Sequence, residues 1–261
     1  MEKVILSVKN LSCGYGSRTI LRDVSFEVGT GEFIGIIGPN GSGKTTLLRA
    51  ISKAIPLKKE SRVVFNGRSI ADMSYQELAK ETAVVLQSQE DGAFYTTVRE
   101  NVLLGRIPHF GRFQWVEGKN DHDIAEESMR LLDIAALGDR SVNEISGGER
   151  QRASIARALA QKPRLLIMDE PVAHLDINHR IEIFGLLKRL IKEGGITVIC
   201  ALHDLNLASK YCARIILLSE GRIARQGSPR DIITEENIKN VYKAETKIYR
   251  GSDGGNPQIV Y

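Results

Sequence analysis

The sequence predicts an α/β fold with a mixed, mostly parallel sheet, an N-terminal antiparallel β subdomain and an inserted α-helical subdomain. Short alternating apolar runs at 5–15 and 19–28 are typical of antiparallel strands. A compact apolar run at 31–38 ends in glycine, and a helical pattern follows it at 39–55. This order of strand, glycine loop and helix is the first half of a βαβ unit.

The C-terminal half repeats the alternation of buried strand and helix. Apolar runs at 163–171 and 196–204 predict two further buried strands, and the second is followed by a helical pattern. An amphipathic helix is expected at 176–195, closed by Gly194 and Gly195. Residues 214–227 predict a hairpin that turns at Glu220 and Gly221.

Composition and charge exclude several classes of protein. The chain has 261 residues, is 42% hydrophobic and carries a net charge of +4, which is too small to argue for nucleic acid. No apolar run reaches the roughly 18 residues of a membrane-spanning helix, and the N-terminus lacks a signal-peptide core. Cys13, Cys200 and Cys212 are expected to be reduced thiols. We therefore expect a cytosolic chain that meets a membrane only through a partner.

A glycine-rich loop after the strand at 31–38 carries the clearest chemical signal. The stretch "GPNGSGKTT" has the phosphate-loop pattern of Gly, four residues, Gly-Lys-Ser/Thr between a strand and a helix. Lys44 can reach the outer phosphates, and the Thr45 hydroxyl can ligate Mg²⁺. The pattern predicts a P-loop NTPase core. Its candidate nucleotide-binding residues are Gly38, Pro39, Asn40, Gly41, Ser42, Gly43, Lys44, Thr45 and Thr46.

Two carboxylates end the buried strand at 163–171. Ligands of α/β sheets sit at the carboxyl ends of the strands, so Asp169 and Glu170 are expected near the phosphate loop. Asp169 is the candidate metal ligand, acting directly or through water. Glu170 is the candidate general base that polarises an attacking water.

These motifs together resemble the ATP-binding subunit of an ATP-binding-cassette (ABC) transporter. "GPNGSGKTT" is similar to Walker A, "LLIMDE" to Walker B and "ISGGERQR" to the signature of that family, and the resemblance covers roughly residues 3 to 245. It implies ATP and Mg²⁺ as cofactors, with Lys44, Glu170 and His203 as the catalytic residues. Within one domain over 1–261, it places a nucleotide-binding core at 1–86 and 144–228, a helical insertion at 87–143, and a short helix and tail at 229–261. The end of that tail is expected to be flexible.

The resemblance also assigns roles to single residues. Tyr15 matches the aromatic residue that stacks on adenine, and Asp176 matches the D-loop. His203 matches the switch histidine at the γ-phosphate. Gln87 matches the Q-loop glutamine, a ligand of Mg²⁺ or water, with Gln89 as a competitor two residues later.

The signature implies a pair of subunits. Ser146, Gly147 and Gly148 form a second anion-binding helix start, which in the family serves ATP held by the other subunit of a head-to-tail homodimer. Two departures from the family pattern occur, Ile145 for Leu and Glu149 for Gln. Glu149 stays among the candidate nucleotide contacts, and its charge also favours a helix N-terminus. The helical insertion is expected to receive two transmembrane permease subunits, with a substrate-binding protein as an indirect partner.

Residues 169–190 and 201–234 resemble the importers of ferric siderophores, haem and cobalamin. The implied function is ATP-driven uptake of such a metal chelate, from the cytoplasmic face of the membrane. Import of molybdate or another small solute is an alternative. A non-transport ABC ATPase that acts on nucleic acid or ribosomes is disfavoured, because the chain has one cassette, no sustained heptads and no cysteine pairs. Nucleic acid is not an expected partner. His174 and His179 are assigned no chemistry.

Overall fold

The computed structural model describes residues 3–86, 96–111, 116–172, 175–250 and 255–260. The chain forms two compact units, one of Met1–Met73 with Gly195–Tyr261 and the other of Ser74–Gly194. The first unit therefore contains both ends of the chain, and the second is continuous. The domain boundaries expected above stay a prediction.

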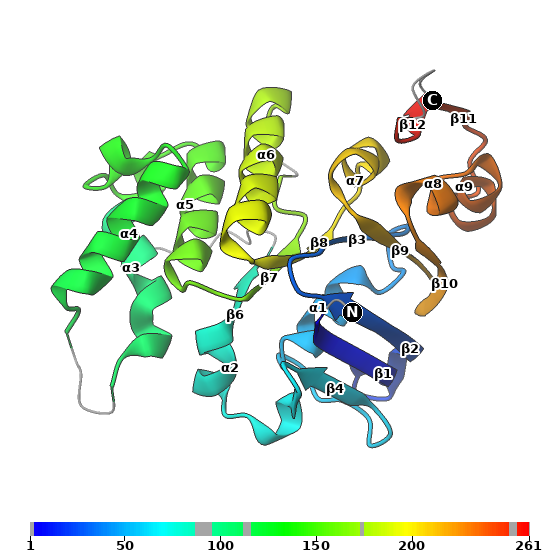
Figure 1. The fold of residues 1–261 in the computed structure, drawn as a ribbon, viewed down its shortest axis with the longest axis horizontal. Coiled ribbons are helices and arrows are strands. Elements are labelled where there is room, and N and C mark those ends of the chain that lie inside the picture. Colours follow the sequence, from blue (N-terminus) through cyan, green and yellow to red (C-terminus); the bar gives the residue numbers. More distant parts are fainter. Residues whose placement is uncertain (1–2, 87–95, 112–115, 173–174, 251–254, 261) are drawn as a thin grey trace. The chain divides into compact units, whose positions relative to one another are not determined.

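The first unit begins with an antiparallel sheet in the order β2-β1-β4-β5 (Figure 1). Its strands are β1 (Val4–Tyr15), β2 (Arg18–Gly29), β4 (Arg62–Phe65) and β5 (Arg68–Ser69). Buried and exposed residues alternate along the second half of β2, as expected for a sheet with one covered face. The antiparallel N-terminal subdomain is confirmed.

The same unit holds a second group of strands that is mostly parallel. These strands are β3 (Phe33–Ile37), β8 (Thr197–Ala201), β9 (Arg214–Ser219) and β10 (Arg222–Gly227). β3 lies between β8 and β9 and is parallel to both, and every residue of β3 and β8 is buried. β9 and β10 form the predicted hairpin. Glu220 and Gly221 both have positive φ, 50° and 76°, which is the conformation that matches the twist of a two-residue hairpin turn.

Short helices and a terminal hairpin complete the first unit. They are α1 (Lys44–Ile51), the 3₁₀ helix η1 (Ile70–Asp72), α7 (Leu205–Tyr211), α8 (Pro229–Ile232), α9 (Glu235–Tyr242), β11 (Lys247–Tyr249) and β12 (Gln258–Val260). β12 pairs antiparallel with β11, and Ile259 is buried. The expectation of a flexible end was wrong for β12, because a buried side chain and strand pairing hold it.

The second unit combines two parallel strands with a helical group (Figure 1). The strands are β6 (Thr82–Val85) and β7 (Leu165–Asp169). The α-helices are α2 (Tyr75–Glu81), α3 (Val98–Leu103), α4 (Lys119–Leu131), α5 (Gly147–Ala160) and α6 (Ile177–Gly194), and the 3₁₀ helices are η2 (Leu104–His109), η3 (Ala135–Leu137) and η4 (Val142–Glu144). α3, α4 and α5 pack against one another. Fully buried Val98, Met129 and Ile155 lie on these three helices.

An ion pair is buried within this helical group. Arg106 Nε lies 2.9 Å from Asp121 Oδ1, and the two side chains are only 7% and 10% exposed. Arg106 Nη1 also donates to the carbonyl of Ala160 at 2.7 Å, and Asp121 Oδ2 accepts from the Gly118 N–H at 3.0 Å. One charged pair therefore joins η2, the start of α4 and the end of α5.

Both units have the mixed α/β character that the sequence predicts, so the fold class is confirmed. Among the described residues, no helix has the length and hydropathy needed to cross a bilayer.

Candidate functional site

The phosphate loop runs from the end of β3 to the start of α1, both within the first unit. Gly38 and Gly43 have positive φ, 153° and 106°. A Cβ atom on Gly38 would lie 2.3 Å from the carbonyl oxygen of Leu218, and one on Gly43 would lie 2.6 Å from a methyl of Leu21. Only glycine fits these two positions, which explains their place in the motif.

Lys44 is the first residue of α1, and it is almost fully buried. Its Nζ donates to the carbonyl of Gly38 at 2.9 Å and to that of Pro39 at 3.4 Å. The ammonium group is thereby folded back over the loop. A buried positive charge beside the N-terminus of a helix makes this loop a strong site for an anion.

Ser42 supplies a second indication of a ligand in the loop. Its Oγ is buried and has no hydrogen-bond partner among the described residues. The Ser42 carbonyl accepts from the N–H of Gly221 at 3.1 Å, so a backbone hydrogen bond joins the phosphate loop to the β9–β10 turn. Buried hydroxyls are normally hydrogen-bonded. A phosphate oxygen would satisfy this one, so the loop residues fit a nucleotide.

Tyr15 and His203 belong to the same unit as the loop. Tyr15 ends β1 with 46% of its surface exposed, and its Oη accepts from Arg49 Nη1 of α1 at 3.3 Å. His203 is exposed two residues after β8. Because β8 is parallel to β3, His203 and Gly38 follow strands that end at the same edge of the sheet. The structure brings these predicted residues into one unit.

Asp169 and Glu170 lie at the end of β7 in the second unit. Asp169 is 3% exposed, and its Oδ1 is buried without a hydrogen-bond partner among the described residues. Glu170 has φ 51°, a left-handed conformation that costs a non-glycine residue roughly 1–3 kcal/mol. Such strain is concentrated at functional sites. Gln87 and its competitor Gln89 lie outside the described residues.

The signature forms the start of α5. Ser146 is the N-cap residue, Gly147 and Gly148 are the first two helical residues, and Ile145 is buried in place of the usual Leu. The Glu149 N–H donates to Ser146 Oγ at 3.2 Å, and the Ser146 N–H donates to Glu149 Oε2 at 2.7 Å. This reciprocal pair is a capping box.

The capping box gives the side chain of Glu149, one of the two departures from the family pattern, a partner within its own helix start. Hydrogen bonds from the Ser146 side chain and backbone hold the pKa of the Glu149 carboxyl below its usual value of 4.5. The carboxylate engages its own N-cap and helps to stabilise the helix start. The prediction that Glu149 contacts nucleotide stays a prediction.

We expect Glu149→Ala to lower the free energy of unfolding by about 0.3–1.5 kcal/mol, because half of the capping box is lost. Glu149→Gln keeps an oxygen acceptor and should cost less. A lowered pKa in the folded state adds stability that is present above the usual pKa of 4.5 and is lost at lower pH. Both pH 7 and pH 5 lie above 4.5, so urea unfolding of the parent, Glu149→Ala and Glu149→Gln should rank their stabilities in the same order at both values. An Ala variant as stable as the parent would contradict this role.

Asp176 precedes α6 and makes contacts that the sequence did not reveal. Its Oδ1 accepts from the His179 N–H at 2.9 Å, and its Oδ2 lies 2.9 Å from His179 Nδ1. The backbone hydrogen bond from His179 is the main cause of the lowered pKa of the Asp176 carboxyl. His179 therefore orients Asp176, and the only sequence signal was their i, i+3 spacing. His174 lies outside the described residues.

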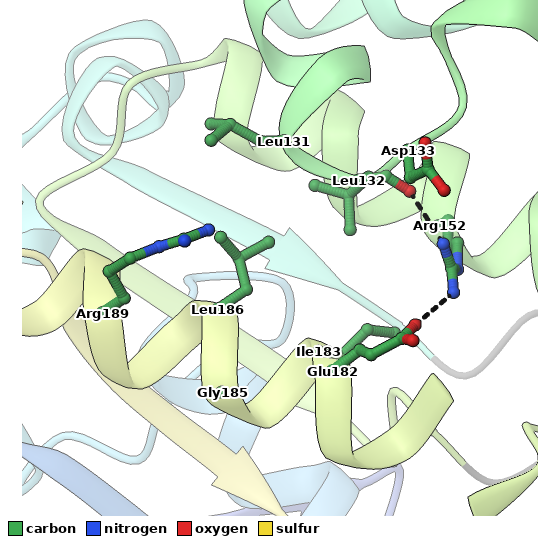
Figure 2. A pocket seen from close by; sticks show the side chains of 9 residues that line it. All are labelled: Leu131, Leu132, Asp133, Arg152, Glu182, Ile183, Gly185, Leu186 and Arg189. Carbon is green, nitrogen blue, oxygen red and sulfur yellow. Dashed lines mark hydrogen bonds and ion pairs between the residues drawn. The ribbon is translucent and has the colours of Figure 1, made fainter. Parts of the chain in front are cut away.

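A cavity of about 410 Å³ in the second unit contains none of the predicted site residues (Figure 2). It lies between the end of α4 and the middle of α6, and Leu131, Leu132, Ile183 and Leu186 are among its lining residues. Arg152 borders it and bonds to both the Leu132 carbonyl at 3.1 Å and Glu182 at 2.7 Å. The glycines, the buried lysine and the orphaned hydroxyl lie at the phosphate loop instead, which makes that loop the candidate nucleotide site.

Residues 21–173 match the ABC transporter family. The chain is 39% identical, over 98% of its length, to the uncharacterized ABC transporter ATP-binding protein YvrA of Bacillus subtilis, and covers 57% of that protein. It is 38% identical, over 97% of its length, to the ferric enterobactin transport ATP-binding protein FepC of Escherichia coli, and covers 92% of that protein.

Solved structures agree with these relatives. The dimeric structure of MJ0796, a bacterial ABC transporter cassette, superposes with a TM-score of 0.75 at 31% identity. The superposition covers 86% of this chain and 98% of that one. The resemblance drawn from the three motifs is thereby confirmed. The chain belongs to the ABC transporter family, as an ATP-binding and ATP-hydrolysing subunit.

Proposed function

We propose that this chain powers the import of an iron-siderophore, haem or cobalamin-type metal chelate through separate permease subunits, from the cytoplasmic face of the membrane. The observation that carries the proposal is the similarity to FepC over nearly the full length of both chains. A cargo of another class, such as molybdate, is the second candidate, because the ATP-binding subunit does not itself contact the cargo.

The roles of the site residues follow from their chemistry. The loop amides, Ser42 and Lys44 would hold the phosphates, and the exposed ring of Tyr15 would stack on adenine. Glu170 would accept the proton of the attacking water, and His203 would contact the γ-phosphate.

The residues also fit Mg²⁺. The orphaned Oδ1 of Asp169 is the kind of buried carboxylate oxygen that a cation satisfies. Thr45, at the start of α1, and Gln87 would complete the ligand set with Asp169. A bound Mg²⁺ neutralises charge on the phosphates during transfer.

We propose that two copies pack head to tail, so that Ser146, Gly147 and Gly148 contact ATP held by the other copy. Asp176, at the start of α6, would lie at this interface. Ile177 and Ile181 are exposed in the first two turns of α6, one helical turn apart, and so share a face beside Asp176. An apolar face next to a predicted nucleotide contact supports burial against a second copy. The MJ0796 cassette was solved as a dimer, which supports the pairing of two copies.

A second exposed apolar surface supports permease docking. Leu104 and Ile107 are exposed on η2, where side chains three residues apart line up on a 3₁₀ helix. α2 packs against η2, with Gln76 Nε2 donating to the Pro108 carbonyl at 3.0 Å, and Tyr75 of α2 is also exposed. We call Tyr75, Leu104 and Ile107 the η2 surface. A helix from each permease subunit would cover it.

The test is to express the tagged chain in its own cells, extract the membranes gently and identify what co-purifies. We expect a permease with membrane-spanning helices, together with ATP-dependent uptake of a ferric chelate. Ile107→Glu should reduce permease recovery and uptake at least tenfold, because a carboxylate replaces an apolar contact. ATP binding should not change.

The matched control is Val4→Glu, which changes an exposed apolar residue of the first unit. It should leave permease recovery intact. Recovery of ribosomes or nucleic acid without a permease would refute the transport proposal, and uptake of molybdate instead of a ferric chelate would select the second candidate.

A further inference from the structure

The C-terminal strand β12 is bonded to α7, the helix that begins just after His203. Asn206 Oδ1 accepts from the Ile259 N–H at 2.8 Å, and Asn206 Nδ2 donates to the Ile259 carbonyl at 3.1 Å. A single side-chain amide therefore satisfies both backbone groups of one strand residue. In this way Asn206 covers the free edge of β12.

Two further hydrogen bonds and a buried side chain extend this attachment, which we call the C-terminal clasp. Ser209 Oγ donates to the Pro257 carbonyl at 2.5 Å, and Asn256 Nδ2 donates to the Ser209 carbonyl at 2.6 Å. The Ile259 side chain is only 4% exposed. The clasp comprises Asn206 and Ser209 on α7, Asn256 and Pro257 just before β12, and Ile259 within β12.

α7 depends on such contacts for its orientation. It has seven residues, and helices shorter than about 12 residues are marginal without tertiary packing. The elements that pack against it include β3, β12 and α8. Asp204, the residue after His203, caps the helix by accepting from the Asn206 and Leu207 N–H groups at 2.9 and 3.0 Å. Asn206 thus belongs to both the cap and the clasp.

This continuity links the C-terminus to the predicted site. His203 is exposed, and the backbone that carries it enters the capped first turn of α7. A shift of that turn would move His203 relative to the phosphate loop of the same unit. Displacements of about 1 Å in a catalytic group can cost two orders of magnitude in rate.

We propose that the C-terminal clasp positions His203, with Asn206 and Ile259 as positioning residues for ATP hydrolysis. The inference rests on the proposed role of His203. It predicts that breaking the clasp lowers kcat while ATP is still bound normally, because the phosphate loop and Tyr15 lie on other elements.

Asn206→Asp is the sharpest test. The change is nearly isosteric, removes the donor to the Ile259 carbonyl and places a carboxylate oxygen against that carbonyl. It also puts a negative charge in the first turn of α7, which favours the helix itself. We expect kcat for ATP hydrolysis by the full chain to fall about five- to twentyfold. The Kd of a fluorescent ATP analogue should stay within about twofold, and amide hydrogen exchange over 205–211 should become faster.

Ile259→Ala should act in the same direction through lost packing, whereas Gln258→Ala, an exposed residue of the same strand, should leave kcat and exchange unchanged. Full kcat in both clasp variants, unchanged exchange in α7, or a parallel loss of nucleotide affinity would each overturn the positioning role. A parent chain without ATPase activity would refute the proposed function as well. An active parent with fully active clasp variants would refute only the clasp.

Discussion

Replacing Glu170 by Gln is expected to lower the ATPase turnover by a factor of about 10²–10⁴ while ATP still binds. Glutamine keeps the size and hydrogen-bonding reach of the side chain but cannot accept the proton of the attacking water. The backbone at Glu170 is already in a left-handed conformation, with φ 51°, and we expect the substitution to leave it unchanged. Steady-state hydrolysis and the Kd of an ATP analogue measure the two effects separately.

The same variant should accumulate as an ATP-bound dimer, because a ligand shared by two subunits stabilises their association until it is hydrolysed. Size-exclusion chromatography with light scattering would show the shift from monomer to dimer on addition of ATP and Mg²⁺. Glu127→Gln, an exposed carboxylate of α4, serves as the control and should behave like the parent. Full turnover in Glu170→Gln would remove Glu170 from the role of base.

The sequence predicted the elements whose signals are local. A glycine pattern between an apolar run and a helical run identified the phosphate loop, and Glu220 with Gly221 identified the β9–β10 turn, because both depend on backbone conformations that few residues adopt. The contact between that turn and Ser42 joins residues far apart in the chain, and no local pattern encodes it.

The C-terminal clasp escaped prediction for a related reason. A short polar segment with several glycines has the composition of a flexible tail. The pairing of β12 with β11 and its hydrogen bonds to Asn206 join residues far apart in the chain, which no local pattern encodes. The role of Glu149 was partly foreseen from its charge near a helix start. The structure added the reciprocal bonds with Ser146.

No sequence pattern predicted the buried ion pair between Arg106 and Asp121 in the second unit. Of all the substitutions considered, breaking this pair is expected to reduce stability most. Asp121→Asn should lower the free energy of unfolding by about 3–5 kcal/mol, because the Arg106 charge would stay buried without its counter-charge. Urea unfolding at pH 7 measures the loss.

The pH dependence gives this prediction a second measurement. Burial raises the pKa of the Asp121 carboxyl, but hydrogen bonds from Arg106 and from the Gly118 backbone, with the charge of Arg106, lower it below its usual value of 3.8. A lowered folded-state pKa gives stability that is complete above 3.8 and is lost as the pH falls through the folded-state value. The difference in unfolding free energy between parent and variant should therefore be constant at neutral pH. It should shrink only when the pH falls below about 3.8.

A matched control tests whether the loss of stability depends on the burial of the ion pair or on the loss of any ion pair. Asp139 lies 3.4 Å from Arg99, but its side chain is 93% exposed, so Asp139→Asn should cause no measurable loss. Arg106→Met combined with Asp121→Leu removes both charges together and should recover part of the stability lost in Asp121→Asn, because no buried charge is then left unpaired. If the double replacement were less stable than Asp121→Asn, the unpaired charge would not be the source of the loss. The hydrogen bonds to Ala160 and Gly118 would then be the contacts that hold η2 to α4 and α5.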